Sequence, residues 1–193
     1  MNRIICWIVM LFVTHTTLHA QSAKFQYGGM QHFSLSNTDI STFPGVNFIN
    51  GVRYQNRFFA GIGFSFNFVN PYNNLFFLTT RYRSIPLYLD GRYYMGNKRS
   101  LFILADLGLN PTYLRSSEWD NNTGNKGYAG YYSNIGAGAK GRLGREVFYT
   151  VDIAYNMSRA SFDWMTTNQI GQPSKTHYQI LSQMLIIRMG LEL

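Results

Sequence analysis

The sequence predicts an all-β protein, an eight-stranded antiparallel up-and-down transmembrane β-barrel. Charged residues make up only 13% of the chain, whereas soluble domains carry about 25%. Apolar and polar residues alternate through most of the sequence, as they do in strands with two different faces. No run after residue 20 is long and apolar enough to form a membrane-spanning helix. A closed barrel pairs every backbone group between strands, so such a chain can still face lipid.

Residues 1–20 are predicted to be a cleaved secretory signal peptide. Arg3 precedes an unbroken apolar run from Ile4 to Val13, and Leu18-His19-Ala20 is typical of a cleavage site before Gln21. An uncleaved N-terminal anchor is the alternative. The barrel domain is expected to span residues 21–193 and to contain no cysteine, because the single cysteine, Cys6, lies in the signal. Export of a barrel domain predicts that the protein is located in the outer membrane of a Gram-negative bacterium.

Eight segments carry the alternation. They span residues 24–35, 45–54, 58–69, 75–94, 100–114, 128–142, 147–159 and 176–193. The connections near residues 56, 97 and 145 are short, and those near 40, 72, 121 and 168 are longer on average, an asymmetry typical of bacterial barrels. Pro86 lies inside the fourth segment and cannot donate a ladder hydrogen bond, so we expect a bulge near Ser84-Ile85-Pro86.

The composition of the polar face indicates that it lies inside the barrel. This face has many glycines and a few charges of both signs, whereas a water-facing surface would be dense in Lys and Glu. A soluble barrel with its apolar face inside is the alternative. We expect the lumen charges to form a salt-bridge network that holds the barrel closed, and a narrow ion path is the functional alternative. They are Asp90, Arg92, Asp106, Lys140, Arg142, Asp152, Arg188 and Glu192.

One stretch resembles a recurrent strand of the PorT-type "porin family" of outer-membrane barrels. It runs Arg83-Ser84-Ile85-Pro86-Leu87-Tyr88-Leu89 and is followed by Arg92-Tyr93-Tyr94. The glycine-rich sixth segment and Arg188-Met189-Gly190 fit the same pattern. The resemblance implies an eight-stranded barrel inserted by the outer-membrane assembly machinery, with a role in protein secretion for some members. Such chains commonly end in an aromatic residue, whereas this sequence ends in Leu193.

The sequence offers no convincing catalytic site, and we expect no enzymatic activity, cofactor or metal. His32 and His177 are the only histidines after residue 20, which excludes a histidine–cysteine zinc cluster. The Gly-x-Gly motifs at 61–63 and 136–138 lie inside predicted strands, which argues against nucleotide binding. A lipid A-modifying enzyme is a weaker alternative, in which Ser174, His177 and Asp163 near the last long connection form a triad.

The expected partners are outer-membrane lipid, lipopolysaccharide and another envelope protein. The net charge of +8 does not indicate nucleic acid, because an exported barrel rarely meets it. Basic residues at the short turns would attract anionic headgroups; they are Arg57, Lys98, Arg99 and Arg145. A structural or interaction role is the leading hypothesis and a narrow pore for ions or small solutes is the second. The loop residues expected to contact a partner are Trp119, Phe162, Trp164 and Met165.

Overall fold

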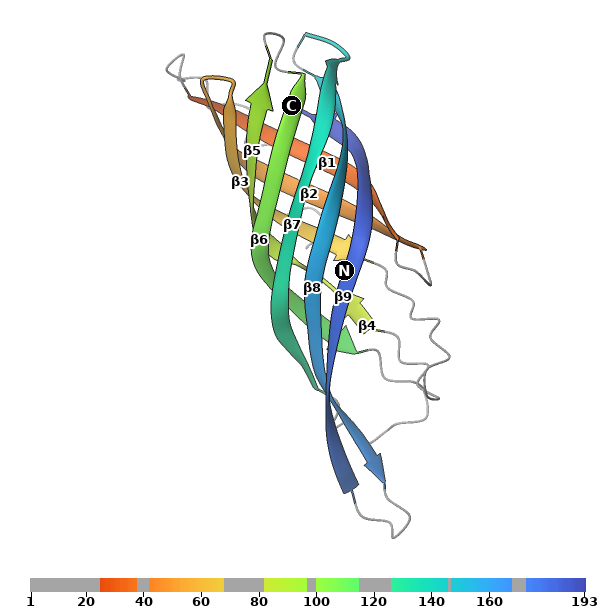
Figure 1. Cartoon of the computed structure of the whole chain (residues 1–193). Helices are drawn as coiled ribbons and strands as arrows, with labels where there is room; N and C mark the ends of the chain where they lie inside the picture. The colour runs from red at the N-terminus through yellow and green to blue at the C-terminus, as the bar shows by residue number, and fades with distance from the viewer. Residues whose placement is uncertain are drawn as a thin grey trace, which may run out of the picture.

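Eight antiparallel strands close into a barrel in the computed structural model of the chain (Figure 1). The structure describes residues 25–37, 42–67, 82–96, 100–114, 126–145, 147–167 and 173–193. The strands are β1 (Phe25–Asn37), β2 (Thr42–Tyr54), β3 (Phe58–Asn67), β4 (Tyr82–Ser84), β5 (Leu87–Met95), β6 (Leu101–Leu114), β7 (Lys126–Arg142), β8 (Phe148–Thr167) and β9 (Pro173–Glu192). In this part of the chain, no helix is long and apolar enough to cross a membrane.

With β4 and β5 counted as one interrupted strand, each strand pairs with its neighbours in the sequence, and the last pairs with the first. The closing ladder joins β1 to β9 from Met30↔Glu192 to Asn37↔Leu185. Figure 1 shows β1, β2 and β3 running at a steep angle behind β7, β8 and β9, as tilted strands around a closed barrel do. The predicted eight-stranded up-and-down barrel is therefore confirmed.

The strand that contains Pro86 is interrupted, but the bulge predicted near Ser84-Ile85-Pro86 is absent, because the registers with β3 and with β6 are the same on both sides of the break. β4 and β5 occupy one position in the barrel, between β3 and β6, and residues 85–86 separate them. Hydrogen bonds hold both sides of the break, because Ser65 N donates to Pro86 O at 3.0 Å and Ile85 N donates to Pro111 O at 3.1 Å. The irregularity therefore interrupts the strand without opening the barrel.

A tight turn joins β2 to β3 and explains why this connection is short. Gln55 and Asn56 have positive φ angles of 50° and 55°, and Arg57 N donates to Tyr54 O at 3.0 Å. Two successive residues with positive φ match the twist of the flanking strands, and asparagine tolerates this conformation better than most residues. Residues 55–57 thus lie at the same end of the barrel as the last residues of β5, because Phe58 pairs with Tyr93.

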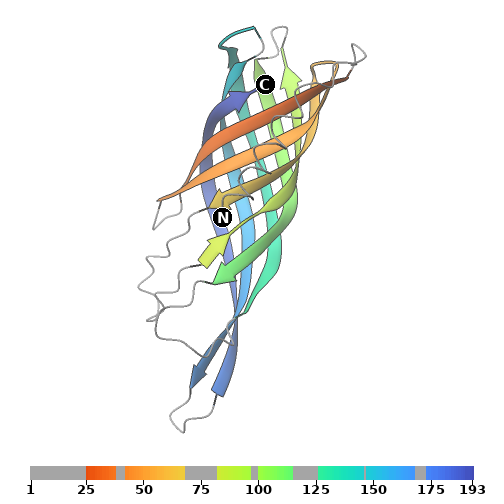
Figure 2. The ribbon, with the colours of Figure 1, turned by 180° about the vertical axis from the view of Figure 1, so that it is seen from behind.

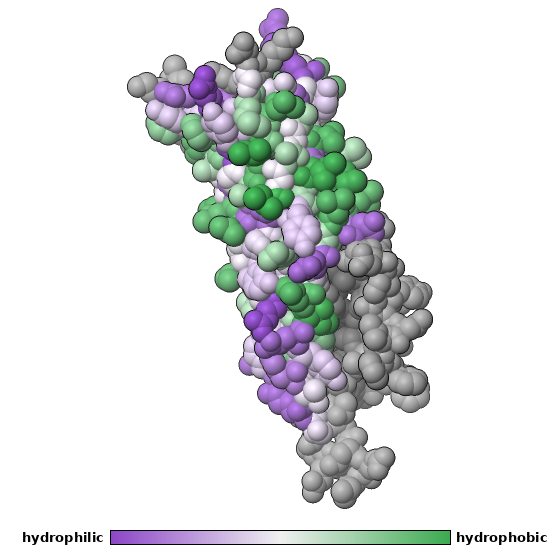
Figure 3. Space-filling view, viewed as in Figure 1, coloured by the Kyte–Doolittle hydropathy of each residue, from purple (hydrophilic) through white to green (hydrophobic). Residues whose placement is uncertain are grey.

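The outward face of the barrel is apolar. Phe33, Ile62, Leu89, Leu107 and Ile135, from five different strands, are between 64% and 71% exposed. Figure 3 shows hydrophobic residues gathered over the upper part of the barrel, with hydrophilic residues at the top and over the lower extension. Exposed apolar surface on this scale marks a face that is covered by another apolar phase.

The β8–β9 hairpin extends beyond the rest of the barrel. Its ladder continues to Thr167↔Pro173, whereas the pairing of β9 with β1 stops at Leu185. Figure 2 shows the same hairpin projecting from behind. The prediction that residues 160–175 form a loop is therefore wrong for 160–167 and 173–175, which continue the two strands.

Aromatic side chains fill much of the lumen. The buried set comprises Phe59, Tyr88, Tyr94, Phe102 and Tyr132, and the rings of Tyr88 and Tyr132 lie 5.2 Å apart. Glycines on the adjacent strands leave room for these rings. A Cβ atom at Gly63 would overlap Tyr88, and one at Gly138 would overlap Phe102. The glycines of the polar face therefore accommodate an aromatic plug.

Candidate functional site

Arg188 is the centre of the lumen charge network. Its Nε donates to Asp152 Oδ1 at 2.7 Å and its Nη1 donates to Asp106 Oδ2 at 2.9 Å. Asp152 is the cross-strand partner of Arg188, whereas Asp106 lies on β6, two strands further around the barrel. All three residues are at most 1% exposed. One guanidinium therefore ties β9 to both β8 and β6 through the interior.

Amide side chains extend this cluster. Asn134 Nδ2 donates to Asp106 Oδ2 at 2.7 Å and to the Tyr132 hydroxyl oxygen at 2.8 Å. Asn156 Nδ2 in turn donates to Asn134 Oδ1 at 2.6 Å. Each amide thus donates to a residue on the neighbouring strand. These hydrogen bonds orient the Asp106 carboxylate toward Arg188 and distribute the carboxylate's charge over β7 and β8.

Asp90 and Arg92 form a second buried pair within β5. Arg92 Nε donates to Asp90 Oδ1 at 3.0 Å, and Arg92 Nη2 donates to Asp90 Oδ2 at 3.1 Å. The guanidinium carbon lies 5.2 Å from the centre of the Phe102 ring, within the range of a cation–π contact. This bidentate ion pair largely neutralises the charges of Asp90 and Arg92 within β5 itself.

Glu192 forms a third group near the short-turn end. It accepts from Arg53, from Lys140 Nζ at 3.4 Å and from the Tyr94 hydroxyl at 3.2 Å. Lys140 Nζ also lies over the rings of Tyr94 and Phe148, 4.2 and 4.7 Å from their centres. β2, β5, β7 and β9 therefore converge on one carboxylate. Arg53 is absent from the lumen charges predicted from the sequence, and the structure adds it to the network.

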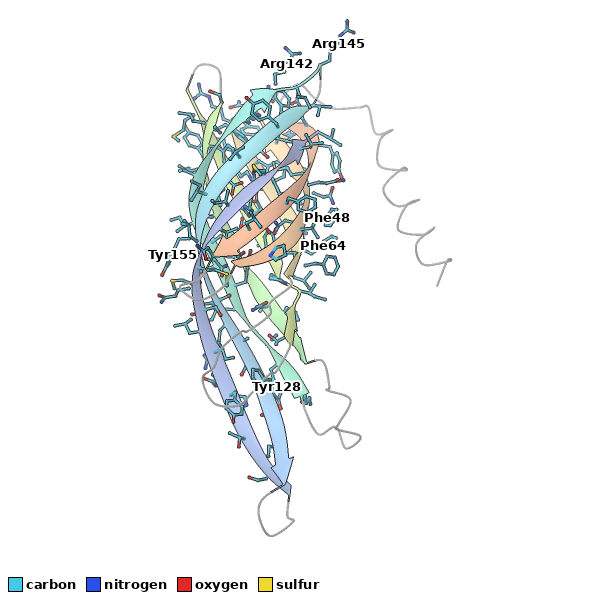
Figure 4. All side chains as sticks on the ribbon, turned by 90° about the vertical axis from the view of Figure 1, so that its right-hand side faces the viewer. Phe48, Phe64, Tyr128, Arg142, Arg145 and Tyr155 are labelled. Atoms are coloured by element: carbon cyan, nitrogen blue, oxygen red, sulfur yellow. The ribbon has the colours of Figure 1, made fainter. Side chains whose placement is uncertain are left out.

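Arg142 does not join the lumen network. It is exposed at the β7–β8 turn, where its Nε donates to Gly144 O at 2.8 Å and its Nη2 donates to Arg145 O at 3.1 Å. Figure 4 shows Arg142 and Arg145 together at this end of the barrel, far from Tyr128 near the other end of β7. The prediction that Arg142 faces the lumen is wrong, because the strand ends there and its side chain turns to cap the following residues.

Cations and anions are balanced in the described lumen. Arg53, Arg92, Lys140 and Arg188 face Asp90, Asp106, Asp152 and Glu192. Several buried polar atoms have no partner among the protein atoms, including His32 Nδ1, Asp106 Oδ1 and Arg188 Nη2. Buried polar groups in folded proteins are almost always hydrogen-bonded to protein or to water. The interior therefore combines complete ion pairs with positions suited to ordered water.

The expected loop contacts are placed differently from the prediction. Phe162 lies in β8, is 4% exposed and stacks on Tyr178 with ring centres 5.5 Å apart, so it is not an exposed loop residue. Trp164 and Met165 continue β8 and pair with Thr176 and Lys175, but their side chains are outside the described part. Trp119 lies outside the described residues altogether.

A second polar cluster occupies the β8–β9 extension. Asp163 accepts from Tyr128, from Lys175 Nζ at 2.8 Å and from His177 Nδ1 at 2.7 Å. Lys175, Tyr128 and His177 together hold the pKa of the Asp163 carboxyl well below its usual range, and Asp163 raises the pKa of Lys175. The other side of the His177 ring carries Ser161, with Oγ 3.1 Å from Nε2.

The structure brings together two members of the triad considered from the sequence, His177 and Asp163, but replaces the third. Ser174 lies three residues before His177 in β9, and side chains an odd number of positions apart point to opposite faces of a strand. Ser161, which sequence reasoning did not single out, occupies the place expected for Ser174. Among the described residues, no group of His, Cys, Asp and Glu is placed to hold a metal ion.

Comparisons with known proteins identify the fold. No protein-family model and no curated protein matches the chain. The crystal structure of neisserial surface protein A matches with a TM-score of 0.54 at 11% identity, over 89% of this chain and 97% of that one. The solid-state NMR structure of outer membrane protein AlkL in DMPC bilayers matches with a TM-score of 0.50 at 10% identity, over 90% and 92%. The chain has the fold of a small outer-membrane β-barrel.

Proposed function

We propose that this chain is an integral outer-membrane barrel of a Gram-negative bacterium with a structural or interaction role. The observation that carries the proposal is the distribution of side chains: apolar residues cover the outside while the charges are enclosed. A hydrocarbon environment favours this arrangement and water opposes it. The fold shared with neisserial surface protein A and AlkL supports the same location.

The lumen supports a sealing role. The aromatic plug and the ion pairs of Arg188 and Glu192 cross the interior at different heights, since these two residues lie four positions apart on β9. An eight-stranded barrel has an interior just wide enough for side chains to fill. With the interior closed, the β8–β9 extension is the surface among the described residues that we assign to contact with another envelope protein. Figure 4 places Tyr128, near the start of β7, beside that extension and beyond Phe48, Phe64 and Tyr155 on the outside of the barrel.

Planar-bilayer recording tests the sealed lumen. Purified protein is reconstituted, its insertion is verified by protease protection, and single-channel current is recorded. The wild type is expected to show no stable conductance steps, whereas Arg188→Ala, which removes the central cation, is expected to leak. Arg142→Ala is the matched control, because this arginine lies outside the network. Stable steps in the wild type would contradict the sealing role.

A narrow pore for ions or small solutes is the second candidate. It is favoured by the buried polar atoms that lack protein partners, at His32, Asp106 and Arg188, because a chain of water molecules through such positions would conduct ions. The same recordings separate the two candidates. Steps in the wild type that disappear when Asn134→Leu fills the polar region with apolar atoms would establish the pore.

The resemblance to PorT-type barrels supports a finer proposal, that the protein is an accessory part of a secretion or envelope assembly. Residues 83–94 carry that resemblance and include the interrupted β4–β5 strand. Chemical crosslinking in intact cells followed by affinity purification tests it. We expect a specific envelope protein to be captured by the wild type and lost when residues 164–175 are replaced by a short turn. Capture of abundant porins alone would argue against an assembly role.

The proposal includes removal of residues 1–20, which lie outside the described part of the chain. Mass spectrometry of protein purified from outer membranes tests this directly. We expect a mature amino terminus at Gln21. Retention of Met1 would support the alternative of an uncleaved anchor.

A further inference from the structure

Ser161, Asp163 and His177 share the outward face of the β8–β9 hairpin. Asp163 and His177 are cross-strand partners, and the register between the two strands is continuous along the whole hairpin. Residues at odd positions of β8 therefore stay on the same face of the hairpin as the exposed Ile153, although Ser161 and Asp163 are themselves only 8% and 2% exposed. The three side chains meet on a surface that the lumen network does not reach.

The contacts run in the order of a nucleophile, a base and an acid. Ser161 Oγ lies 3.1 Å from His177 Nε2, and Asp163 Oδ1 lies 2.7 Å from His177 Nδ1, on the opposite side of the imidazole. Serine hydrolases use this arrangement, in which histidine takes the serine proton and aspartate holds the imidazole in place. Ser161 is buried, with 8% of its surface exposed, whereas the His177 side chain is 47% exposed, so the pair opens to the surface on the imidazole side.

The neighbouring residues set the tautomer that this chemistry needs. Arg159 donates to Gln179 Oε1, which leaves the Gln179 amide nitrogen facing His177 Nε2 at 3.2 Å. An amide nitrogen only donates, so Nε2 must be the acceptor and the imidazole proton must sit on Nδ1, where it bonds Asp163. His177 Nε2 is therefore placed to accept the proton of Ser161.

We propose that Ser161, His177 and Asp163 form a hydrolase site for acyl esters of an amphiphile held at the membrane boundary. The exposed Leu181 lies on the same face of the hairpin, and the Ser161↔Gln179 pair lies two residues beyond it, about 7 Å along the strand. The ester groups of membrane lipids lie where acyl chains meet headgroups. This substrate assignment rests on the proposed membrane position, whereas the triad itself does not, and it departs from the expectation of no enzymatic activity.

The reaction needs only the ester and water. Ser161 Oγ bonds to the carbonyl carbon while its proton passes to His177 Nε2, and the ester C–O bond then breaks as the alcohol leaves with that proton. Water attacks the acyl-serine, gives a proton to Nε2 and releases the carboxylic acid, and Ser161 regains its proton. Gln179 is the cross-strand partner of Ser161, and we assign its amide N–H and the Arg159 guanidinium bonded to it as donors to the developing oxyanion. Asp163 acts as a positioning residue through His177.

Covalent labelling with diisopropyl fluorophosphate tests the triad in detergent-solubilised full-length protein. We expect mass spectrometry to find the phosphoryl adduct on Ser161, and expect Ser161→Ala and His177→Gln to abolish it. Asp163→Asn, which favours the other tautomer, is expected to slow labelling by about 10⁴-fold. Ser174→Ala on the opposite face is the matched control and should label like the wild type. Heat-modifiable electrophoretic mobility verifies that each variant is folded.

No adduct on folded wild-type protein, or an adduct on another serine, would overturn the proposal. The substrate class is tested separately in micelles with p-nitrophenyl esters. We expect the decanoate to be cleaved at least about tenfold faster than the acetate, because Leu181 binds the acyl chain. Equal rates would overturn the assignment to amphiphiles. Recovery of the protein outside the outer membrane would instead refute the proposed function and leave the labelling result standing.

Discussion

Replacing Arg188 by methionine is expected to be among the most damaging single changes in the lumen. Arg188 is 1% exposed and is the cation for both Asp106 and Asp152, at 2.9 and 2.7 Å. Methionine has a similar length but no charge, so two carboxylates remain in the interior without their partner. Breaking a buried ion pair by removing one member costs about 3–5 kcal/mol, most of which is the desolvation of the charge that is left.

The compensating variant separates charge from shape. Arg188→Met combined with Asp106→Asn and Asp152→Asn removes the whole cluster and leaves no uncompensated charge. Replacing complete buried ion clusters with neutral groups is often neutral or stabilising. We therefore expect the triple variant to recover most of the free energy of unfolding lost by the single variant.

Urea unfolding in micelles, followed by tryptophan fluorescence and by electrophoretic mobility, measures these free energies. Reversibility is checked by starting from both folded and unfolded protein. Arg142→Met serves as the control, since Arg142 contacts only the carbonyls of the β7–β8 turn among the described hydrogen bonds. A loss below about 1 kcal/mol for Arg188→Met, or a triple variant as unstable as the single one, would refute the reasoning about buried charge.

Three further predictions concern the outer face, the lumen glycines and the extension. Leu107→Arg is expected to cost about 2–4 kcal/mol in urea unfolding in lipid vesicles, because a cation then faces the acyl chains; an unchanged free energy of unfolding would count against lipid contact. Gly63→Val is expected to lower the yield of folded barrel, since its Cβ would overlap the Tyr88 ring, and Gly63→Val with Tyr88→Ala should recover part of it; equal yields would show that the ring can move. Lys175→Met is expected to raise the pKa of Asp163 toward its ordinary value, measured by NMR titration of the carboxyl carbon. Because the pKa of Asp163 is lowered in the folded protein, the ionised carboxylate stabilises the hairpin at pH values above the pKa of the unfolded chain, near 4. This stabilisation is lost as the pH falls through the lowered, folded-state pKa. An identical Asp163 titration in the variant would contradict the role of Lys175.

The number of strands and the orientation of their faces follow from the sequence because lipid and lumen impose opposite demands on alternate residues. Leu107 and Asp106 show this directly, since adjacent positions of β6 are 66% and 0% exposed. Pro86 marks the interruption between β4 and β5, but proline alone does not predict one, because Pro44 and Pro111 lie inside the unbroken strands β2 and β6. The alternation of lipid-facing and lumen-facing residues is a local pattern that can be read from a single sequence.

The partners of the lumen residues could not be predicted, because they depend on the stagger between strands. Asp106 and Arg188 meet across β6 and β9, which no sequence spacing specifies. The burial of Tyr94 and Phe102 in the lumen could not be predicted either. They are aromatic residues at positions that alternate with the apolar face, and glycines such as Gly138 provide the space for them.

The β8–β9 extension escaped prediction for a related reason. Beyond the apolar band both faces of a hairpin can contact water, so the period-two pattern fades and residues 160–175 look like a loop. The pairing of Ser161 with His177 then depends on the exact register of that hairpin. Ser174 is closer to His177 in the sequence but lies on the other face, which only the strand assignment reveals.

Site-directed spin labelling tests most directly whether the apolar face contacts lipid. The chain has one cysteine, Cys6, so Cys6→Ser provides a background for single labels in reconstituted vesicles. Labels at Leu89, Leu107 and Ile153 are expected to be relaxed by molecular oxygen and shielded from a water-soluble nickel chelate, whereas a label at Lys175 should show the reverse. Nickel access at Leu107 equal to that at Lys175 would contradict a barrel embedded in a membrane.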